Sequence, residues 1–350
     1  MTPKTATHKS APHRMVAGID LGGTAVNYTF LDERGQFLLD GLCEYPSRSV
    51  EGPGICLDQI ADGLGIAADR AGVRLADVVA VGLDTPGPAS AAGVLSKRGS
   101  TNFVHCAWAG YDIRLALEQK LNCPATYLND GNAAALWGHV ALFGSDNKAT
   151  SVSAIIGTGL GGGVITSGRV VVGQNGFGGE LGHVLVPFST IADIEGLRPV
   201  CNCGRIGDLE SLCSLTAIKK TLLPYFLLRQ PDHQLAKISD VGQAAKLVRG
   251  LAEQGDPLCR DIFRVQAHAL GLFFDEMINI FDPDALIVGG GAVETSQAFQ
   301  QWFLAEIRVG MPTQREEQAG LAIHVISGGD TAGARGAALE AARIVRERRL

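Results

Sequence analysis

The sequence lacks a basic excess and long apolar runs, and both absences narrow what the protein can do. Its 30 lysines and arginines stand against 36 aspartates and glutamates, so the formal net charge is −6. A nucleic-acid surface normally carries a basic excess, which argues against DNA or RNA as a partner. No uninterrupted apolar run reaches the roughly 18 residues that span a bilayer, so we expect no membrane partner.

The chain also shows neither a secretory leader nor a disulfide framework. Residues 1–14, MTPKTATHKSAPHR, contain no apolar stretch, so we expect a short disordered tail and no signal peptide. The cysteines follow no paired spacing: the sequence scatters Cys43, Cys56, Cys106 and Cys123, and it clusters Cys201, Cys203 and Cys213. In a chain of 350 residues this pattern favours reduced thiols and a cytoplasmic location.

Glycine is abundant, and several glycines directly follow predicted strands. Strands are expected at Met15–Ile19, Ala25–Leu31 and Gln36–Leu42, with DERG as the turn before the last of them. The same order returns from Ser151, where SVSAII, GTGLGGG, VIT, SGR and VVVG read as strand, turn, strand, turn and strand. Such a repeat of topology predicts two similar α/β domains that face each other across a cleft.

The rest of the pattern completes these two domains. Helices are expected at 54–72, at Tyr111–Leu121, after the strand ATYLND, over most of 214–280 and in the closing segment AGARGAALEAARIVRER; further strands are expected at DVVAVGLDTPG and DALIVGGGAV. We predict a smaller N-terminal domain of residues 15–128 plus a C-terminal helix at about 331–350. A larger domain of residues 129–330 carries a loop at 183–213.

The glycine turns suggest a binding site for phosphate. Residues 157–162, GTGLGG, match the dinucleotide pattern G-x-G-x-x-G, but that fingerprint needs a helix next and a hairpin follows here. A glycine turn between antiparallel strands can instead present successive N–H groups to an anion. The residues expected to do so are Gly22, Gly23, Thr24, Thr158, Gly159, Gly289, Gly290 and Gly291. The alternative is that these glycines only allow tight hairpins.

Asp20 ends the first predicted strand beside the first of these turns. Hard cations prefer carboxylate and water oxygens, so Asp20 is a candidate to hold Mg²⁺ directly or through water.

These motifs together resemble those of the ROK family of sugar kinases and related repressors. IIGTGLGGGVITSGRVVVGQNGFGGELGH, residues 155–183, is similar to the family's signature. GIDLGGT resembles its first phosphate motif, DTPGP its sugar-side turn, LNDGNAAALWG its catalytic segment, CNCGRIGDLE its zinc loop and PDALIVGGGA its nucleoside loop. The resemblance implies the actin-like ATPase fold, an α/β architecture of two ribonuclease-H-like domains around a cleft. It also implies ATP and Mg²⁺ as cofactors, and a homodimer or homotetramer.

The resemblance also implies roles for particular residues. Asp130 matches the general base that takes the proton of the sugar hydroxyl; a carboxylate at this point, between a strand and a helix, can alternatively be a simple N-cap. The expected sugar ligands are Asn102, Asn129, Asp130, Glu180, His183 and Glu210. Glu180 and His183 lie three apart, so one helical turn would place them on the same side.

Two departures from the family pattern affect these expectations. The structural zinc of the family is held by three cysteines and one histidine, and here His183, Cys201 and Cys203 are matched while Asp208 stands where the third cysteine is expected. Zinc accepts carboxylate oxygen, Cys213 is an alternative ligand, and a metal-free loop is a further alternative. A bound zinc would orient His183 towards the sugar. Ala25 replaces the lysine that often follows GGT, which removes a positive charge near the phosphates.

The function expected from the sequence is an ATP-dependent glucokinase that forms glucose 6-phosphate. An N-acetylglucosamine or N-acetylmannosamine kinase is the alternative within the class, and polyphosphate is an alternative donor. A catalytically silent sugar-binding protein stays open because of Ala25 and Asp208. A DNA-binding repressor is disfavoured, because only 19 residues precede Asp20 and the net charge is negative.

Overall fold

The computed structural model describes residues 14–97, 102–312 and 315–348, so most of the expected tail at 1–14 lies outside the described residues. The chain divides into two compact units. The first unit comprises the residues up to Ala133 together with those from Gly333, and the second comprises Ala134–Ala332. Among the described helices, none combines the length and apolar character needed to cross a membrane.

The first unit is built on a five-stranded mixed sheet with the order β3-β2-β1-β4-β5. Its strands are β1 (Met15–Leu21), β2 (Ala25–Asp32), β3 (Glu44–Pro46), β4 (Val78–Thr85) and β5 (Ala125–Asn129). β1 is antiparallel to β2 but parallel to β4, and β4 is parallel to β5. The carboxyl ends of β1, β4 and β5 therefore lie along one edge of the sheet.

The expected third strand at Gln36–Leu42 is wrong. Phe37 makes only an isolated bridge to Leu31, and the strand that pairs with β2 is Glu44–Pro46. The short apolar run after the DERG turn resembled a strand, but a strand also needs a partner with free backbone groups. β2 offers its outer edge to the later segment at Ala25–Asn27.

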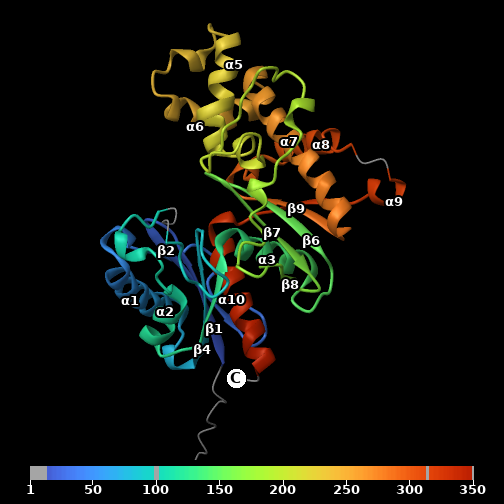
Figure 1. Cartoon of the computed structure of the whole chain (residues 1–350). Helices are drawn as coiled ribbons and strands as arrows, with labels where there is room; N and C mark the ends of the chain where they lie inside the picture. Colours follow the sequence, from blue (N-terminus) through green and yellow to red (C-terminus); the bar gives the residue numbers. More distant parts are fainter. Residues whose placement is uncertain (1–13, 98–101, 313–314, 349–350) are drawn as a thin grey trace, which may run out of the picture. The chain divides into compact units, whose positions relative to one another are not determined.

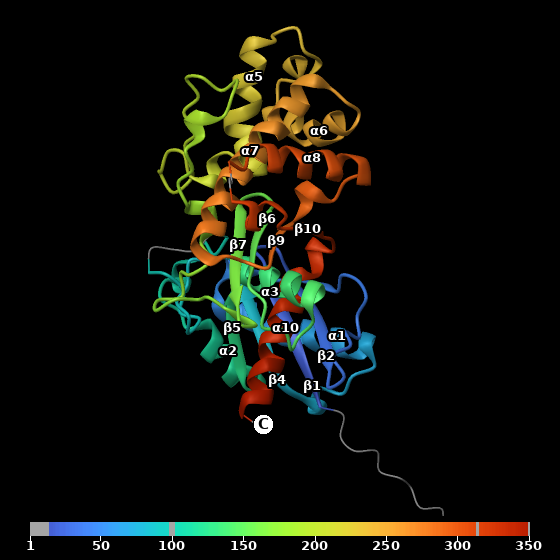
Figure 2. The same cartoon turned by 90° about the vertical axis from the view of Figure 1, so that its right-hand side faces the viewer.

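Helices cover both faces of this sheet. α1 (Pro53–Ala71) and α2 (Ile113–Leu121) lie together on one face, and α10 (Gly329–Arg348) crosses β1 and β4 on the other (Figures 1 and 2). On the α1 side, the Tyr28 hydroxyl donates a hydrogen bond to the carbonyl of Ile60 at 3.1 Å. α3 (Asp130–Phe143) follows β5 directly.

α10 approaches the sheet unusually closely because two facing strand residues are glycines. A Cβ on Gly18 would lie 1.9 Å from the carbonyl oxygen of Ala334, and a Cβ on Gly82 would lie 1.9 Å from that of Ala337. Gly18 and Gly82 are paired across β1 and β4, so together they form a shallow track that receives the helix backbone. Any side chain here would push α10 outward.

The second unit repeats the topology of the first, with the strand order β10-β9-β6-β7-β8. Its strands are β6 (Ser151–Ile156), β7 (Leu160–Thr166), β8 (Arg169–Val170), β9 (Ala285–Gly289) and β10 (Ile323–Ile326). In each unit an antiparallel meander of three strands is extended by two parallel strands, which confirms the predicted repeat. β7 begins at Leu160, so the glycine turn is shorter than the predicted GTGLGGG.

The helices of the second unit supply its main core. They are α4 (Leu215–Ala217), which continues through a π-helical turn at Ile218–Leu222, α5 (Leu223–Arg229), α6 (Val241–Glu253), α7 (Pro257–Phe281), α8 (Gln297–Val309) and α9 (Glu316–Ala319). α7 begins at a proline and is capped by Asp256, whose carboxylate accepts from the N–H of Cys259. Its buried side packs Phe263, Phe273 and Phe274 into one continuous cluster with the sheet.

Candidate functional site

The β1–β2 turn of the first unit leaves backbone donors available. The N–H of Gly22 is used within the turn, since it donates to the carbonyl of Ala25 at 2.9 Å. The hydroxyls of Ser47 and Ser49 donate to the carbonyl of Gly23 and hold the turn in place. Within the described part of the chain, the N–H groups of Gly23 and Thr24 have no acceptor. Two adjacent amides are therefore available to an anion.

Asn102 lies directly on this turn. A Cβ on Gly23 would stand 2.6 Å from the Cβ of Asn102, so glycine is required for the contact. Asn102 itself has a φ of 70°, a left-handed conformation that asparagine tolerates better than most residues. The predicted sugar ligand and the predicted phosphate turn are thus neighbours within the first unit.

Asp20 has an acidic neighbour that the sequence motifs did not indicate. Asp20 of β1 pairs in register with Asp84 of β4, so both side chains emerge on the same face of the sheet. Asp84 is fully buried, and burial raises the pKa of its carboxyl well above the ordinary value, an effect that the charges of Asp20 and Asp130 increase. Burial also raises the pKa of Asp20, while the neighbouring side chains of Asp84 and Asn27 lower it. Asp84 is the first residue of DTPGP, a motif in which only the turn was expected to have a role. The sequence feature that could have indicated a role for Asp84 is an acid inside an otherwise apolar strand.

Asp130 begins α3 immediately after Asn129 ends β5. The N–H of Gly131 donates to Oδ1 of Asp130 at 2.7 Å and to Oδ1 of Asn129 at 2.9 Å. Asp130 is exposed and its charge acts on Asp84. The expected base therefore lies at the same carboxyl edge of the sheet as Asp20 and Asp84.

In the second unit, the β6–β7 turn is braced by Glu210. The N–H of Gly157 donates to the carbonyl of Gly159 at 2.9 Å, and the carbonyl of Thr158 accepts from the N–H and the hydroxyl of Thr216. Oε2 of Glu210 accepts from the N–H of Leu160 at 2.9 Å, and a Cβ on Gly159 would stand 2.6 Å from that oxygen. Glu210 is thus tied to the phosphate-type turn.

The glycines after β9 lie at the same edge of the second sheet. Gly289 ends β9 and pairs with Ile155, one residue before the end of β6. Gly290 has a φ of 87° and packs so closely on Ile156 that a Cβ would be 2.4 Å from its carbonyl oxygen. The Gly291 carbonyl accepts a hydrogen bond from Arg249. The two predicted turns of this unit therefore adjoin each other.

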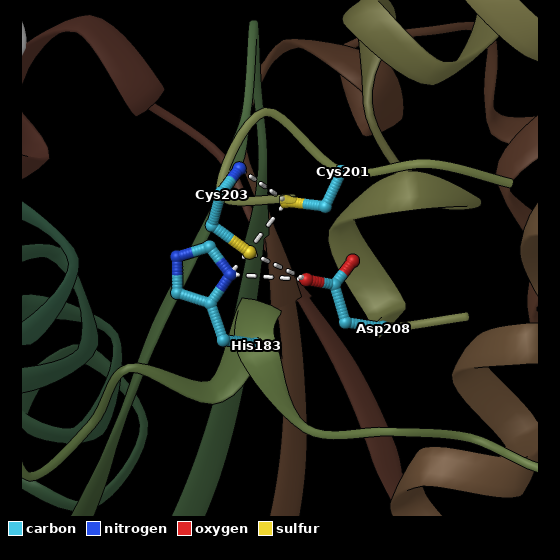
Figure 3. Close-up of side chains that lie close together, drawn as sticks. All are labelled: His183, Cys201, Cys203 and Asp208. Carbon is cyan, nitrogen blue, oxygen red and sulfur yellow. Dashed lines mark hydrogen bonds and ion pairs between the residues drawn. The ribbon is translucent and has the colours of Figure 1, made fainter. Parts of the chain in front are cut away.

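Four side chains gather into a group with the chemistry of a metal site (Figure 3). They are His183, Cys201, Cys203 and Asp208, whose potential ligand atoms all lie within 4.8 Å of one another. Nδ1 of His183 is 3.1 Å from Oδ2 of Asp208 and 3.8 Å from Sγ of Cys201. Sγ of Cys203 is 3.5 Å from the same carboxylate oxygen. Asp208 therefore occupies the place expected for a third cysteine.

Short 3₁₀ turns position this group. His183 ends the turn Leu181–His183, and Asp208 caps the turn Leu209–Ser211 by accepting from the N–H of Ser211 at 3.0 Å. Burial opposes ionisation of Asp208, but hydrogen bonds from Cys201, His183 and Ser211 bring the pKa below the ordinary value. Cys213, the alternative ligand, is fully buried and lies outside this group.

Glu180 and Glu210 adjoin the metal-type group. Burial raises the pKa of Glu180, while the charge of His183 lowers it and that of Glu210 raises it, so the three side chains are electrostatic neighbours. Sγ of Cys201 is 3.5 Å from Oε1 of Glu210. The backbone N–H of His183 donates to the carbonyl of Glu180 at 3.1 Å, as expected for one helical turn. The sugar ligands predicted in the second unit therefore lie together.

The sequence matches the ROK family over residues 16–343. It is 28% identical over 285 residues to a glucokinase from Halalkalibacterium halodurans, covering 79% of this chain and 80% of that protein. Among solved structures, a ROK hexokinase from Thermus thermophilus superposes with a TM-score of 0.73 at 28% identity, covering 95% of this chain and 99% of the other. A ROK family glucokinase from Streptomyces griseus, in complex with glucose and AMPPNP, gives 0.71 at 26% identity, covering 94% and 99%. These likenesses confirm the expected actin-like α/β fold, and the chain belongs to the ROK family.

Proposed function

We propose that this chain is an ATP-dependent hexokinase that transfers the γ-phosphate of ATP to the 6-hydroxyl of glucose. One observation carries the proposal: the edge of the first sheet brings together Asp130 and a turn with two available amides at Gly23 and Thr24. The named glucokinase and hexokinase relatives support the same reaction.

Transfer of a phosphoryl group to an alcohol needs a held phosphate, charge neutralisation and a group that takes the hydroxyl proton. We assign the first role to backbone N–H groups of the glycine turns at Gly22–Thr24, Thr158–Gly159 and Gly289–Gly291. In the first of these turns the available donors are Gly23 and Thr24, since Gly22 donates within the turn. Asp130 takes the proton. Its exposed carboxylate accepts from the N–H of Gly131 through Oδ1, and this hydrogen bond fixes the orientation of the group.

Magnesium, when bound, would neutralise charge on the phosphates of ATP, and Asp20 would hold it. Asp20 fits this role because hard cations prefer carboxylate oxygen and because its neighbours at this edge are themselves acids. Ala25 leaves the turn without a lysine at its end. The reaction therefore relies on the cation and the backbone amides.

Six polar side chains are assigned to the hydroxyls of the hexose. We propose Asn102, Asn129, Asp130, Glu180, His183 and Glu210 as sugar ligands. Burial raises the pKa of Glu180, so a sugar hydroxyl that donates to its carboxylate would stabilise the charged form.

Zinc fits the group of His183, Cys201, Cys203 and Asp208. In a tetrahedral site with bonds of about 2.0–2.3 Å, ligand atoms stand roughly 3.3–3.8 Å apart. The contacts of 3.5 and 3.8 Å fall within that spacing, and the contact of 3.1 Å lies just below it. Zinc would supply a structural crosslink. Because His183 presents Nδ1 to the group, its Nε2 points away from it and remains available to a ligand.

The experiment that tests the function is coupled ADP release with purified protein. Glucose, mannose, fructose, N-acetylglucosamine and N-acetylmannosamine are compared as acceptors, and ATP and polyphosphate as donors. We expect glucose with ATP to give the highest kcat/KM. A preference for an N-acetylhexosamine would make that kinase the function, and sugar binding without ADP release would identify a silent binder. Light scattering on the same sample tests the proposed homodimer or homotetramer, and fractionation tests the proposed cytoplasmic location.

A further inference from the structure

We infer that Asp84 is a second carboxylate ligand of a divalent cation, which Asp20 and Asp84 hold together at the carboxyl edge of the first sheet. The inference deepens the proposed function, on which it rests for the nucleotide phosphates as the cation's other partner. Nothing in the sequence motifs assigned a role to Asp84.

The two carboxylates converge on one point. Asp20 and Asp84 are paired across parallel strands and emerge on the same face. A Cβ on Gly333 of α10 would lie 2.9 Å from Oδ2 of Asp20 and 3.2 Å from Oδ1 of Asp84. Both oxygens therefore lie within reach of a single small volume, which only a residue without a side chain leaves open.

Asp84 has no other way to satisfy its oxygens within the described residues. Its exposed fraction is 0%, and neither Oδ1 nor Oδ2 has a hydrogen-bond partner of standard geometry. A carboxylate without donors in such a place is strongly disfavoured unless an opposite charge or a proton accompanies it. The buried, unpartnered oxygens thus point to a ligand that the polypeptide does not supply.

The surrounding charges favour a cation over a shared proton. The groups that face the pair include Asn27 of β2, which is paired with Asp20, and the acids Glu44 of β3 and Asp130 at the start of α3. One shared proton would neutralise one of the two carboxylates and leave the other charged beside these acids. A divalent cation neutralises both. Oxygen ligands of this kind are those that Mg²⁺ and Mn²⁺ prefer.

The test is a Mn²⁺ titration of the full chain without nucleotide or sugar, followed by the electron paramagnetic resonance of free Mn²⁺. The protein is first loaded with Zn²⁺ so that the group of His183, Cys201, Cys203 and Asp208 does not compete for Mn²⁺. We expect Asp84→Asn and Asp20→Asn each to weaken Mn²⁺ binding by at least about tenfold, because the number of charged ligands sets affinity. Asp62→Asn, which removes an exposed carboxylate of α1, should bind Mn²⁺ as the wild type does.

Wild-type affinity in Asp84→Asn, or no Mn²⁺ binding by the wild type at millimolar concentration, would overturn the inference and leave a shared proton as the explanation. A second measurement needs no variant: Fe²⁺ with ascorbate should cleave the wild-type backbone near residues 20 and 84, and Mg²⁺ should protect against it. Cleavage only elsewhere also overturns the inference. Because neither measurement uses ATP or a sugar, an inactive protein that still binds Mn²⁺ would count against the proposed kinase and not against this site.

Discussion

Replacing Gly82 by alanine should detach α10 from the first sheet. The new Cβ would stand 1.9 Å from the carbonyl oxygen of Ala337 and 2.4 Å from its carbonyl carbon. Ordinary contact begins at 3.4 Å, so the helix has to recede by about 1.5 Å, which is 3.4 minus 1.9. The obstacle is helix backbone, which cannot rotate away as a side chain can.

The loss of stability follows from the gap that this displacement opens between α10 and the residues packed against it. α10 buries Ala334, Ala337, Ala338 and Ala341 almost completely, and a radial gap of about 1 Å already forfeits a quarter to a half of each dispersion contact. Overpacking of a close-packed core costs about 1–3 kcal/mol, and we expect the upper end or more here because the whole helix must move.

Urea unfolding followed by circular dichroism measures this cost. The matched control is Gly65→Ala in the interior of α1, where a Cβ meets nothing within 4 Å. That variant should gain about 0.5–1 kcal/mol from improved helix propensity. If Gly82→Ala unfolds at the wild-type urea concentration, the close approach of α10 is not a determinant of stability and the reasoning fails.

Three further predictions concern single side chains. Asp130→Asn keeps an oxygen that accepts from the N–H of Gly131 but cannot take a proton. We therefore expect kcat to fall roughly 10²–10⁴-fold, while calorimetry shows that glucose still binds. A variant that keeps most of the wild-type kcat would rule out Asp130 as the base. Emission spectrometry should detect zinc in the purified protein and its loss after dialysis against a chelator. Asp208→Cys should retain zinc at chelator concentrations that remove it from the wild type. A purified wild type without metal would contradict the zinc site. Burial lowers the pKa of His139, so below pH about 6.5 the unfolded chain binds a proton that the folded chain does not. Stability in urea should therefore fall from pH 7 to pH 5, and His139→Gln should flatten that slope; an unchanged slope would contradict the assignment.

The metal-type group of His183, Cys201, Cys203 and Asp208 shows which features of a site local motifs can predict. Cys201 and Cys203 are neighbours in sequence, and their pairing with His183 followed from the family resemblance. Asp208 was expected in the same group from the same resemblance, and the contact that brings it there is a bridge between Leu185 and Asp208, which joins two loop segments. Cys213 lies outside the group because its side chain is buried in the core. Neither the bridge nor the burial is visible in residue spacing.

For the glycine turns too, the sequence predicted some features and only the structure showed the others. Their positions after buried strands were readable, because a glycine turn between two apolar runs has a strong local signal. The sequence could not predict which backbone amides of these turns are available to a ligand. The N–H of Gly22 donates within its own turn, whereas those of Gly23 and Thr24 do not. The role of Glu210 as a brace for Leu160 was equally hidden, since the two residues are 50 positions apart.

By itself, the sequence determined the alternation of strands and helices, the repeat of two α/β halves and the family to which the chain belongs. Those properties depend on local periodicity, turn residues and short motifs, which act over a few residues. Only the tertiary structure decided that β3 lies at Glu44–Pro46, that the backbone of α10 packs directly on Gly18 and Gly82, and that Asp84 is buried beside Asp20. These outcomes depend on which distant strand edges and helix faces meet, and chain distance carries no information about such contacts.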